Sequence, residues 1–234
     1  MRILVFMSDN RPLQMDLATA SYNSLAAAIN YEYCKRHSYD FIYYRPYLDD
    51  KDHITLYNCI DPNTKSVRHA SWAKLLSTQE ALKLDYDYVV YTDSDCIFKD
   101  LDHKVEDFIQ TDRDVIFINN TPWGDDMPCA GFYICKVGPG AYQFLQIWWG
   151  QNTPEYNRNH MWEQVSLWNI FRDYEIGLLE EMSFLEQEGQ KIRHVGSCEG
   201  DRRLSYFRAF IAMNGINFSA NMICIKMVEF NTRV

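Results

Sequence analysis

The stretch Tyr88-Val-Val-Tyr-Thr-Asp-Ser-Asp-Cys-Ile-Phe98 joins a run of strand-forming residues to two acids, Asp93 and Asp95. Because alternate side chains of an extended chain share a face, both carboxylates can point to one place where the strand ends. Two neighbouring carboxylates repel each other, and a hard divalent cation such as Mg²⁺ or Mn²⁺ relieves the repulsion through its oxygen ligands. In open α/β sheets, ligands bind at the carboxyl ends of the strands. The stretch therefore predicts a metal that holds a phosphate group.

Strand and helix patterns alternate before this motif. A strand pattern over Ile3–Met7, helical spacing over Leu17–Arg36 and a second strand pattern over Asp40–Tyr44 form a βαβ unit. Such units build parallel sheets with helices on both faces, so we expect an α/β fold with a mostly parallel, Rossmann-like sheet. No Pro/Gly/Ser-rich linker or internal repeat divides the chain, and we expect a single domain over residues 1–234.

The sequence also predicts the local structure of three further segments. The segment Arg45–Val67 lacks a clear period and is expected to be a long surface loop. Helical spacing over His69–Leu84 predicts one helix before the acid motif. The apolar tail Asn221–Phe230 is expected to be a terminal strand or a docking segment.

Composition excludes several classes of protein. A formal net charge of −9 argues against a nucleic-acid binder, because affinity for a phosphate backbone needs a basic face. Seven cysteines with no Cys-x-x-Cys pair fit neither a zinc site nor a complete set of disulfides. The amino-terminal apolar run is too short for a signal peptide, and no run is long enough for a transmembrane helix. These features together predict a cytoplasmic protein.

Several segments, in matching order, resemble the GT-A-fold glycosyltransferases, and are most similar to the family of galactosyl-, mannosyl- and xylosyltransferases (glycosyltransferase family 34). That family has a Trp-x-Lys helix, here Trp72 to Lys74, leading into a strand that ends in Asp-x-Asp. The resemblance covers roughly residues 20–200. The other matching segments are Cys129-Ala-Gly-Phe-Tyr-Ile-Cys135 for the back of the sugar pocket, Trp162-Glu163-Gln164 near the reacting carbon and Arg193-His-Val-Gly-Ser-Cys198 for a third metal ligand.

The resemblance implies a metal-dependent enzyme of glycan biosynthesis. It would move a sugar from a UDP- or GDP-linked donor, with UDP favoured, to a hydroxyl of a glycan acceptor, with retention of configuration. Asp93, Asp95 and His194 are then the expected ligands of Mn²⁺ or Mg²⁺. Residues 1–98 would bind the nucleotide sugar, and residues 99–234 would form the acceptor side and a closing segment.

The same segments suggest further site residues. The expected contacts of the donor nucleotide, phosphates or sugar are Asp9, Asn10, Lys74, Asp93, Ser94, Arg202 and Arg203. Glu163 and Gln164 are expected at the reacting face, and Asp125 and Asp126 would hold acceptor hydroxyls or supply a base. Ordinary structural roles compete with these assignments. An acid at a helix start is favoured by the helix dipole, and paired Asp residues are common in turns.

Two other functions stay open. A phosphatase of the aspartyl-phosphate class also has Asp-x-Asp after an apolar strand. It would need Thr or Val where Ile97 stands, and an acid pair after another apolar strand, whereas Asp125-Asp126 follow Pro-Trp-Gly. The other alternative is a non-catalytic glycan-binding protein or scaffold on a decayed transferase fold. The intact Asp93-Asp95 pair, His194 and Glu163-Gln164 count against decay.

Overall fold

The computed structural model describes residues 1–50, 54–119, 126–151, 157, 159–182, 191–196 and 200–233. Within these residues the central sheet has seven strands in the order β11-β2-β1-β5-β8-β7-β9. The strands are β1 (Ile3–Ser8), β2 (Asp40–Tyr47), β5 (Tyr88–Thr92), β7 (Val115–Asn119), β8 (Pro128–Lys136), β9 (Gly177–Met182) and β11 (Lys226–Asn231). Strand β8 is antiparallel to both neighbours, and the other adjacent pairs are parallel. The expected α/β fold with a mostly parallel sheet is confirmed.

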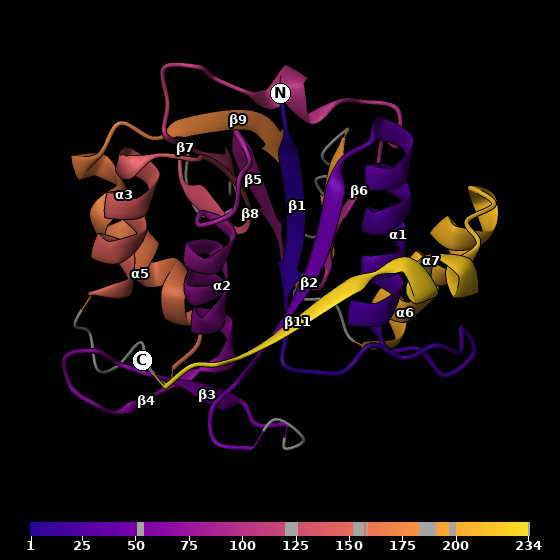
Figure 1. Cartoon of the computed structure of the whole chain (residues 1–234), viewed down its shortest axis with the longest axis horizontal. Coiled ribbons are helices and arrows are strands. Elements are labelled where there is room, and N and C mark those ends of the chain that lie inside the picture. The colour runs from indigo at the N-terminus through magenta and orange to yellow at the C-terminus, as the bar shows by residue number, and fades with distance from the viewer. Residues whose placement is uncertain are drawn as a thin grey trace.

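Helices cover both faces of this sheet (Figure 1). The helices on one face are α2 (Ala73–Ala81), α3 (Pro139–Trp149) and α5 (Trp162–Ile170), and those on the other are α1 (Tyr22–His37), α6 (Gly200–Met213) and α7 (Phe218–Cys224). Because successive strand residues point to opposite faces, β1 contributes Leu4 and Phe6 to one apolar core and Ile3 and Val5 to the other.

The central position of β5 fixes where the acid motif lies. All five residues of β5 are buried, as expected for a strand with helices over both faces. Strands β1 and β5 are parallel, and their register pairs Met7 with Thr92. The residues that follow the two strands, Asp9 and Asp93 among them, therefore leave the sheet at the same edge.

Two small sheets flank the central one. Strand β6 (Cys96–Phe98) pairs antiparallel with β10 (Ile192–His194). We did not predict β6, because three residues directly after the acid motif give too short a pattern. The loop expected over Arg45–Val67 is wrong in part: β2 continues to Tyr47, and β3 (Tyr57–Ile60) forms a hairpin with β4 (Val67–His69). The extension of β2 is stabilised by pairing with β11 from the far end of the chain, which local periodicity does not reveal.

Several helix boundaries also differ from the prediction. Helix α1 begins at Tyr22 rather than Leu17, because the preceding residues form a turn closed by hydrogen bonds to the Asp16 carbonyl. The 69–84 segment starts as a 3₁₀ turn before α2, and the tail is helical in α7 before β11 begins. The 3₁₀ turns are Ala70–Trp72, Val105–Phe108 and Phe171–Asp173.

Two further sequence expectations concern membranes and thiols. Within the described part of the chain, none of the helices combines the length and the apolar content needed to cross a bilayer. The cysteines in that part are free thiols, and all but Cys224 are buried. Cys198 lies outside the described residues.

Candidate functional site

A cavity of about 340 Å³ opens where β1 and β5 end. Four segments supply the predicted site residues in its wall: the end of β1, helix α2, the acid motif after β5, and the start of α5. The predicted site residues that line the cavity are Asp9, Asn10, Lys74, Asp93, Ser94, Asp95 and Glu163. The fold therefore brings together residues that the sequence assigned to one site.

His194 completes a cluster with the two acids. One ligand atom from each of Asp93, Asp95 and His194 can be chosen so that all lie within 4.8 Å of one another. The imidazole Nε2 is 3.1 Å from Asp95 Oδ1 and 3.9 Å from Asp93 Oδ2. The antiparallel register of β6 and β10, which places His194 opposite Cys96, produces this approach. Two carboxylates and an imidazole are a donor set that fits Mn²⁺ or Mg²⁺, with Mn²⁺ better suited to the nitrogen ligand.

Gly131 provides the space for the His194 ring. The Gly131 carbonyl accepts a hydrogen bond from the Asp93 backbone N–H at 2.8 Å. A Cβ atom on Gly131 would lie 2.6 Å from His194 Cε1, closer than carbon atoms can approach. Any larger residue would therefore push the imidazole away from the carboxylates. This explains why a glycine occupies this position of the Cys129-Ala-Gly-Phe segment.

The neighbouring charges set the ionisation of the cluster. Burial on its own would raise the pKa of Asp95, but His194 and Arg203 hold it below its usual range. Burial raises the pKa of Asp93, and the Lys74 ammonium opposes the rise only in part. Burial would lower the pKa of His194, but the Asp95 carboxylate raises it well above its usual range. The proton that this raised pKa favours on His194 offsets part of the carboxylate charge, and a metal ion would have to displace that proton to bind the imidazole nitrogen.

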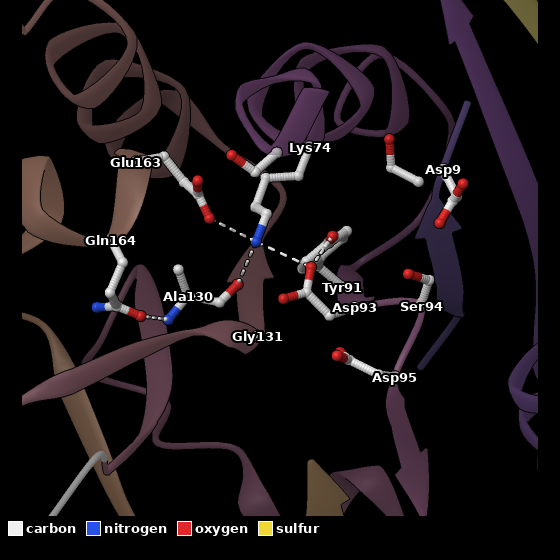
Figure 2. A network of polar contacts seen from close by, with 12 residues as sticks. Asp9, Lys74, Tyr91, Asp93, Ser94, Asp95, Ala130, Gly131, Glu163 and Gln164 are labelled. Carbon is white, nitrogen blue, oxygen red and sulfur yellow. Dashed lines mark hydrogen bonds and ion pairs between the residues drawn. The ribbon is translucent and has the colours of Figure 1, made fainter. Parts of the chain in front are cut away.

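Lys74 lies at the centre of a buried network (Figure 2). Its Nζ is 2.8 Å from both Asp93 Oδ1 and Glu163 Oε1, and it donates to the Ala130 carbonyl at 3.2 Å. The Tyr91 hydroxyl also donates to Asp93 Oδ1. The sequence predicted that Lys74 would contact the donor. Lys74 lines the cavity, so this contact stays a prediction, and the ammonium also pairs with the carboxylates of Asp93 and Glu163.

The neighbours Glu163 and Gln164 have different surroundings. Glu163 is 4% exposed, and among the described residues its Oε2 atom has no hydrogen-bond partner. The Gln164 amide accepts from the Ala130 N–H at 2.7 Å (Figure 2). It also donates to the Pro128 carbonyl at 2.8 Å. Gln164 therefore ties α5 to β8. Glu163 alone of the two lines the cavity.

The opposite wall is organised by an arginine that the sequence analysis missed. Asp9 Oδ1 accepts from the backbone N–H and the Nε of Arg11, both at 2.8 Å. The Arg11 guanidinium donates to Ser94 Oγ at 3.2 Å and lies 4.1 Å from the centroid of the Tyr22 ring. The position of Arg11 directly after Asp9-Asn10 is a signal that could have found it. Tyr22 has no such local signal.

An aromatic pair forms a third part of the wall and was also missed. The His69 and Trp162 rings stack at 3.6 Å with an interplanar angle of 2°. Trp162 has a φ of 36°, a left-handed value that is uncommon for a residue with a side chain. Its position immediately before Glu163 in the resembling segment is the one signal in the sequence.

The remaining candidates are placed as follows. Arg203 contacts Asp95, with Nη2 3.3 Å from Oδ2. Arg202 is exposed and does not line the cavity. Asp126 is also exposed, has a φ of 59° and does not line the cavity. Asp125 lies outside the described residues.

No protein-family model matches the sequence, and a search of curated proteins finds no significant match. Solved structures do match. A glycosyltransferase involved in the glycosylation of the major capsid of PBCV-1 has a TM-score of 0.63 at 13% identity, covering 89% of this chain and 100% of that one. The glycosyltransferase GlyE of Streptococcus pneumoniae TIGR4 has a TM-score of 0.54 at 15% identity, covering 95% of this chain and 62% of its own.

The bifunctional glycosyltransferase WbbM is similar to the same extent, with a TM-score of 0.55 at 13% identity, covering 96% of this chain and 51% of its own. The chain thus spans less than two thirds of GlyE and WbbM but all of the first of these three structures. At these identities the similarity establishes the fold. The chain has the GT-A fold that the sequence resemblance predicted.

Proposed function

We propose that the protein is a metal-dependent glycosyltransferase that moves a sugar from a nucleoside-diphosphate sugar to a hydroxyl of a glycan acceptor. The observation that carries the proposal is the cluster of Asp93, Asp95 and His194 beside a cavity of about 340 Å³. A hard divalent cation and a diphosphate would suit these groups. The GT-A fold agrees with this function, since all three solved structures described above are glycosyltransferases.

Asp93, Asp95 and His194 would hold Mn²⁺ or Mg²⁺, which as a Lewis acid neutralises charge on the departing nucleoside diphosphate. The wall that contains Asp9, Asn10 and Ser94 would then face the nucleotide. We favour UDP over GDP, and we assign residues 1–98 to donor binding and 99–234 to the acceptor side of one domain. The proposed retention of configuration is supported only by the sequence resemblance.

Glu163 is the residue we assign to the sugar. Glu163 lines the cavity, its buried Oε2 atom has no hydrogen-bond partner among the described residues, and Lys74 fixes the orientation of the carboxylate through Oε1. A buried acceptor without a partner is costly, and a sugar hydroxyl would satisfy it. We assign Gln164 a positioning role, because its amide oxygen and its amide nitrogen both bind backbone groups of β8.

The alternatives have less support. In a phosphatase of the aspartyl-phosphate class Asp93 would be the nucleophile, but its Oδ1 is already engaged by Lys74 and Tyr91. A non-catalytic scaffold would give no reason to bury a Glu163 oxygen that has no partner within the described part of the chain, next to an acid cluster. These observations favour the transferase.

The release of UDP from UDP-sugars and of GDP from GDP-sugars, with and without Mn²⁺, tests the proposal without knowledge of the acceptor, because water can replace the acceptor slowly. We expect Mn²⁺-dependent release from one UDP-sugar. The variant Glu163→Gln keeps the shape of the side chain and should bind UDP with Mn²⁺ within about twofold of wild type, while UDP release falls roughly 30-fold, as for loss of a charged hydrogen bond.

Asp126→Asn is the matched control, since it removes a carboxylate that is exposed and does not line the cavity. It should leave both measurements unchanged. Binding of UDP and Mn²⁺ without release from any donor would favour the non-catalytic alternative. Release of phosphate from an aryl phosphate would favour the phosphatase.

A further inference from the structure

Arg203 connects helix α6 to the acid motif. Its Nη2 is 3.3 Å from Asp95 Oδ2, its Nε donates to the Val195 carbonyl at 2.9 Å, and its guanidinium lies 4.4 Å from the Tyr22 ring centroid. The side chain is 12% exposed, so the charge is largely withdrawn from water. We propose that Arg203 is a built-in cation that competes with the divalent ion for Asp95 and then pairs with the diphosphate. This inference rests on the proposed function.

The competition follows from how Asp95 is used. One of its oxygens faces His194 Nε2 at 3.1 Å and the other faces Arg203 at 3.3 Å. A cation that binds Asp95 has to share the carboxylate with the guanidinium, and the two positive charges repel each other at short range. Asp95 is 17% exposed, so water screens this repulsion only in part. In the absence of the diphosphate, the divalent ion therefore binds more weakly than it would bind to the same carboxylates without Arg203.

The diphosphate is the partner that reverses this effect. When a divalent ion draws Asp95 away, the guanidinium needs another anion, and its planar donors fit phosphate oxygens. A second guanidinium, that of Arg11, lies 4.1 Å from the same Tyr22 ring and contacts Ser94 of the acid motif. Two arginines beside one ring, Arg203 in contact with Asp95 and Arg11 in contact with Asp9 and Ser94, give a binding place for a group with several negative charges.

It follows that Arg203 couples the two ligands. The diphosphate removes the competitor from Asp95, and the divalent ion releases the guanidinium for the diphosphate. By linkage, each ligand raises the affinity for the other by the same factor. Arg203 is thus a positioning residue that favours the simultaneous presence of ion and nucleotide over either ligand alone.

Arg202 offers a matched control. It is the preceding residue of α6, carries the same charge and is exposed to solvent. Three dissociation constants are measured: that of Mn²⁺ alone, that of Mn²⁺ with saturating UDP, and that of UDP with saturating Mn²⁺. Calorimetry or the electron paramagnetic resonance signal of free Mn²⁺ gives these values. Arg203→Gln should bind Mn²⁺ alone about tenfold more tightly and UDP in the presence of Mn²⁺ about tenfold more weakly. Arg202→Gln should change each constant by less than about twofold, because exposed charges are screened.

A charge-retaining variant separates competition from packing. Arg203→Lys should bind Mn²⁺ alone within about threefold of wild type, since the positive charge stays near Asp95. If Arg203→Gln binds Mn²⁺ alone no more tightly than wild type, the competition is overturned. If Arg203→Gln fails to fold, the wild-type constants decide: Mn²⁺ affinity that does not rise with UDP overturns the coupling. A wild-type protein that binds no Mn²⁺ even with UDP overturns the proposed function instead.

Discussion

Two buried cations of this protein, Arg68 and Lys74, have opposite surroundings. Arg68 and Asp61 are both fully buried, and the guanidinium uses all three of its nitrogens. It donates to Asp61 Oδ2 at 2.9 Å, to Asn157 Oδ1 at 2.8 Å and to the backbone carbonyls of Trp149 and Gln151 at 2.6 and 2.8 Å. The Asp61 carboxylate accepts three further N–H groups. This cluster is closed, and no position is left for a ligand.

Lys74 is buried almost as deeply, but its cluster is open. Its two carboxylate partners, Asp93 and Glu163, both line the cavity, and Glu163 keeps one oxygen without a partner among the described residues. Burial of a charge therefore does not distinguish a structural cluster from a functional one. What distinguishes them is whether the hydrogen-bonding capacity is used up, because an unused buried group is retained at a cost that a ligand can offset.

The largest expected effect is on the open cluster. Asp95→Asn should lower Mn²⁺-dependent UDP release by about 10³-fold, roughly 4 kcal/mol, because it removes one charge of the metal site. The unfolding free energy should fall by about 1–3 kcal/mol, because His194 and Arg203 lose a charged partner while the amide keeps the shape of the side chain. Donor turnover measures the activity, and urea unfolding measures the stability. A loss of stability as large as that expected for Arg68→Met would contradict the distinction between the clusters.

Replacement of Arg68 should have the reverse effect. Arg68→Met leaves the Asp61 carboxylate buried without its cation, and such a loss costs about 3–5 kcal/mol of stability. Molecules that remain folded should bind UDP and Mn²⁺ as wild type does. The double variant Arg68→Met/Asp61→Asn is the control and should regain part of the stability in urea unfolding. A selective loss of nucleotide binding would show that the closed cluster is not purely structural.

Lys74→Met tests whether the open cluster also stabilises the fold. The substitution leaves two carboxylates without their shared cation, but both face a cavity that water can enter. We therefore expect a smaller loss of stability than for Arg68→Met, about 1–3 kcal/mol, together with loss of UDP release. Thermal unfolding of Lys74→Met and Arg68→Met at one protein concentration compares the two losses of stability. A loss larger than that of Arg68→Met would mean that the two clusters are equivalent in stability.

The smallest effect is a pH dependence of the closed cluster. Burial would raise the pKa of Asp61, but N–H groups of Thr64, Asn157 and Asn63 together with Arg68 lower it below its usual value. Because the folded state binds this proton less readily than the unfolded state, Asp61 stabilises the fold above the unfolded pKa of about 3.9. That contribution is lost as the pH falls from about 4 towards the folded pKa. Asp61→Asn should therefore flatten the dependence of unfolding free energy on pH below about 4, and an unchanged slope would refute the assignment.

Much of the fold was predictable because its signals are local. The strand and helix patterns of the first βαβ unit, and the buried strand before the acids, lie within short windows of sequence. Strand β6 and the hairpin of β3 and β4 were not predictable in this way, since each is short and depends on pairing. The closed cluster of Arg68 and Asp61 gave no signal either, because its partners come from distant segments.

The sequence by itself determined the two acids at the end of a buried strand, the alternation of strands and helices, and the presence of the glycine and histidine of the candidate metal site. The tertiary structure decided which member of each neighbouring pair is used: Glu163 rather than Gln164 faces the cavity, and Arg203 rather than Arg202 contacts Asp95. Adjacent residues of a helix point about 100° apart, so both members of a pair fit the same sequence pattern. Only the packing of α5 and α6 against the sheet selects the side chain that reaches the site.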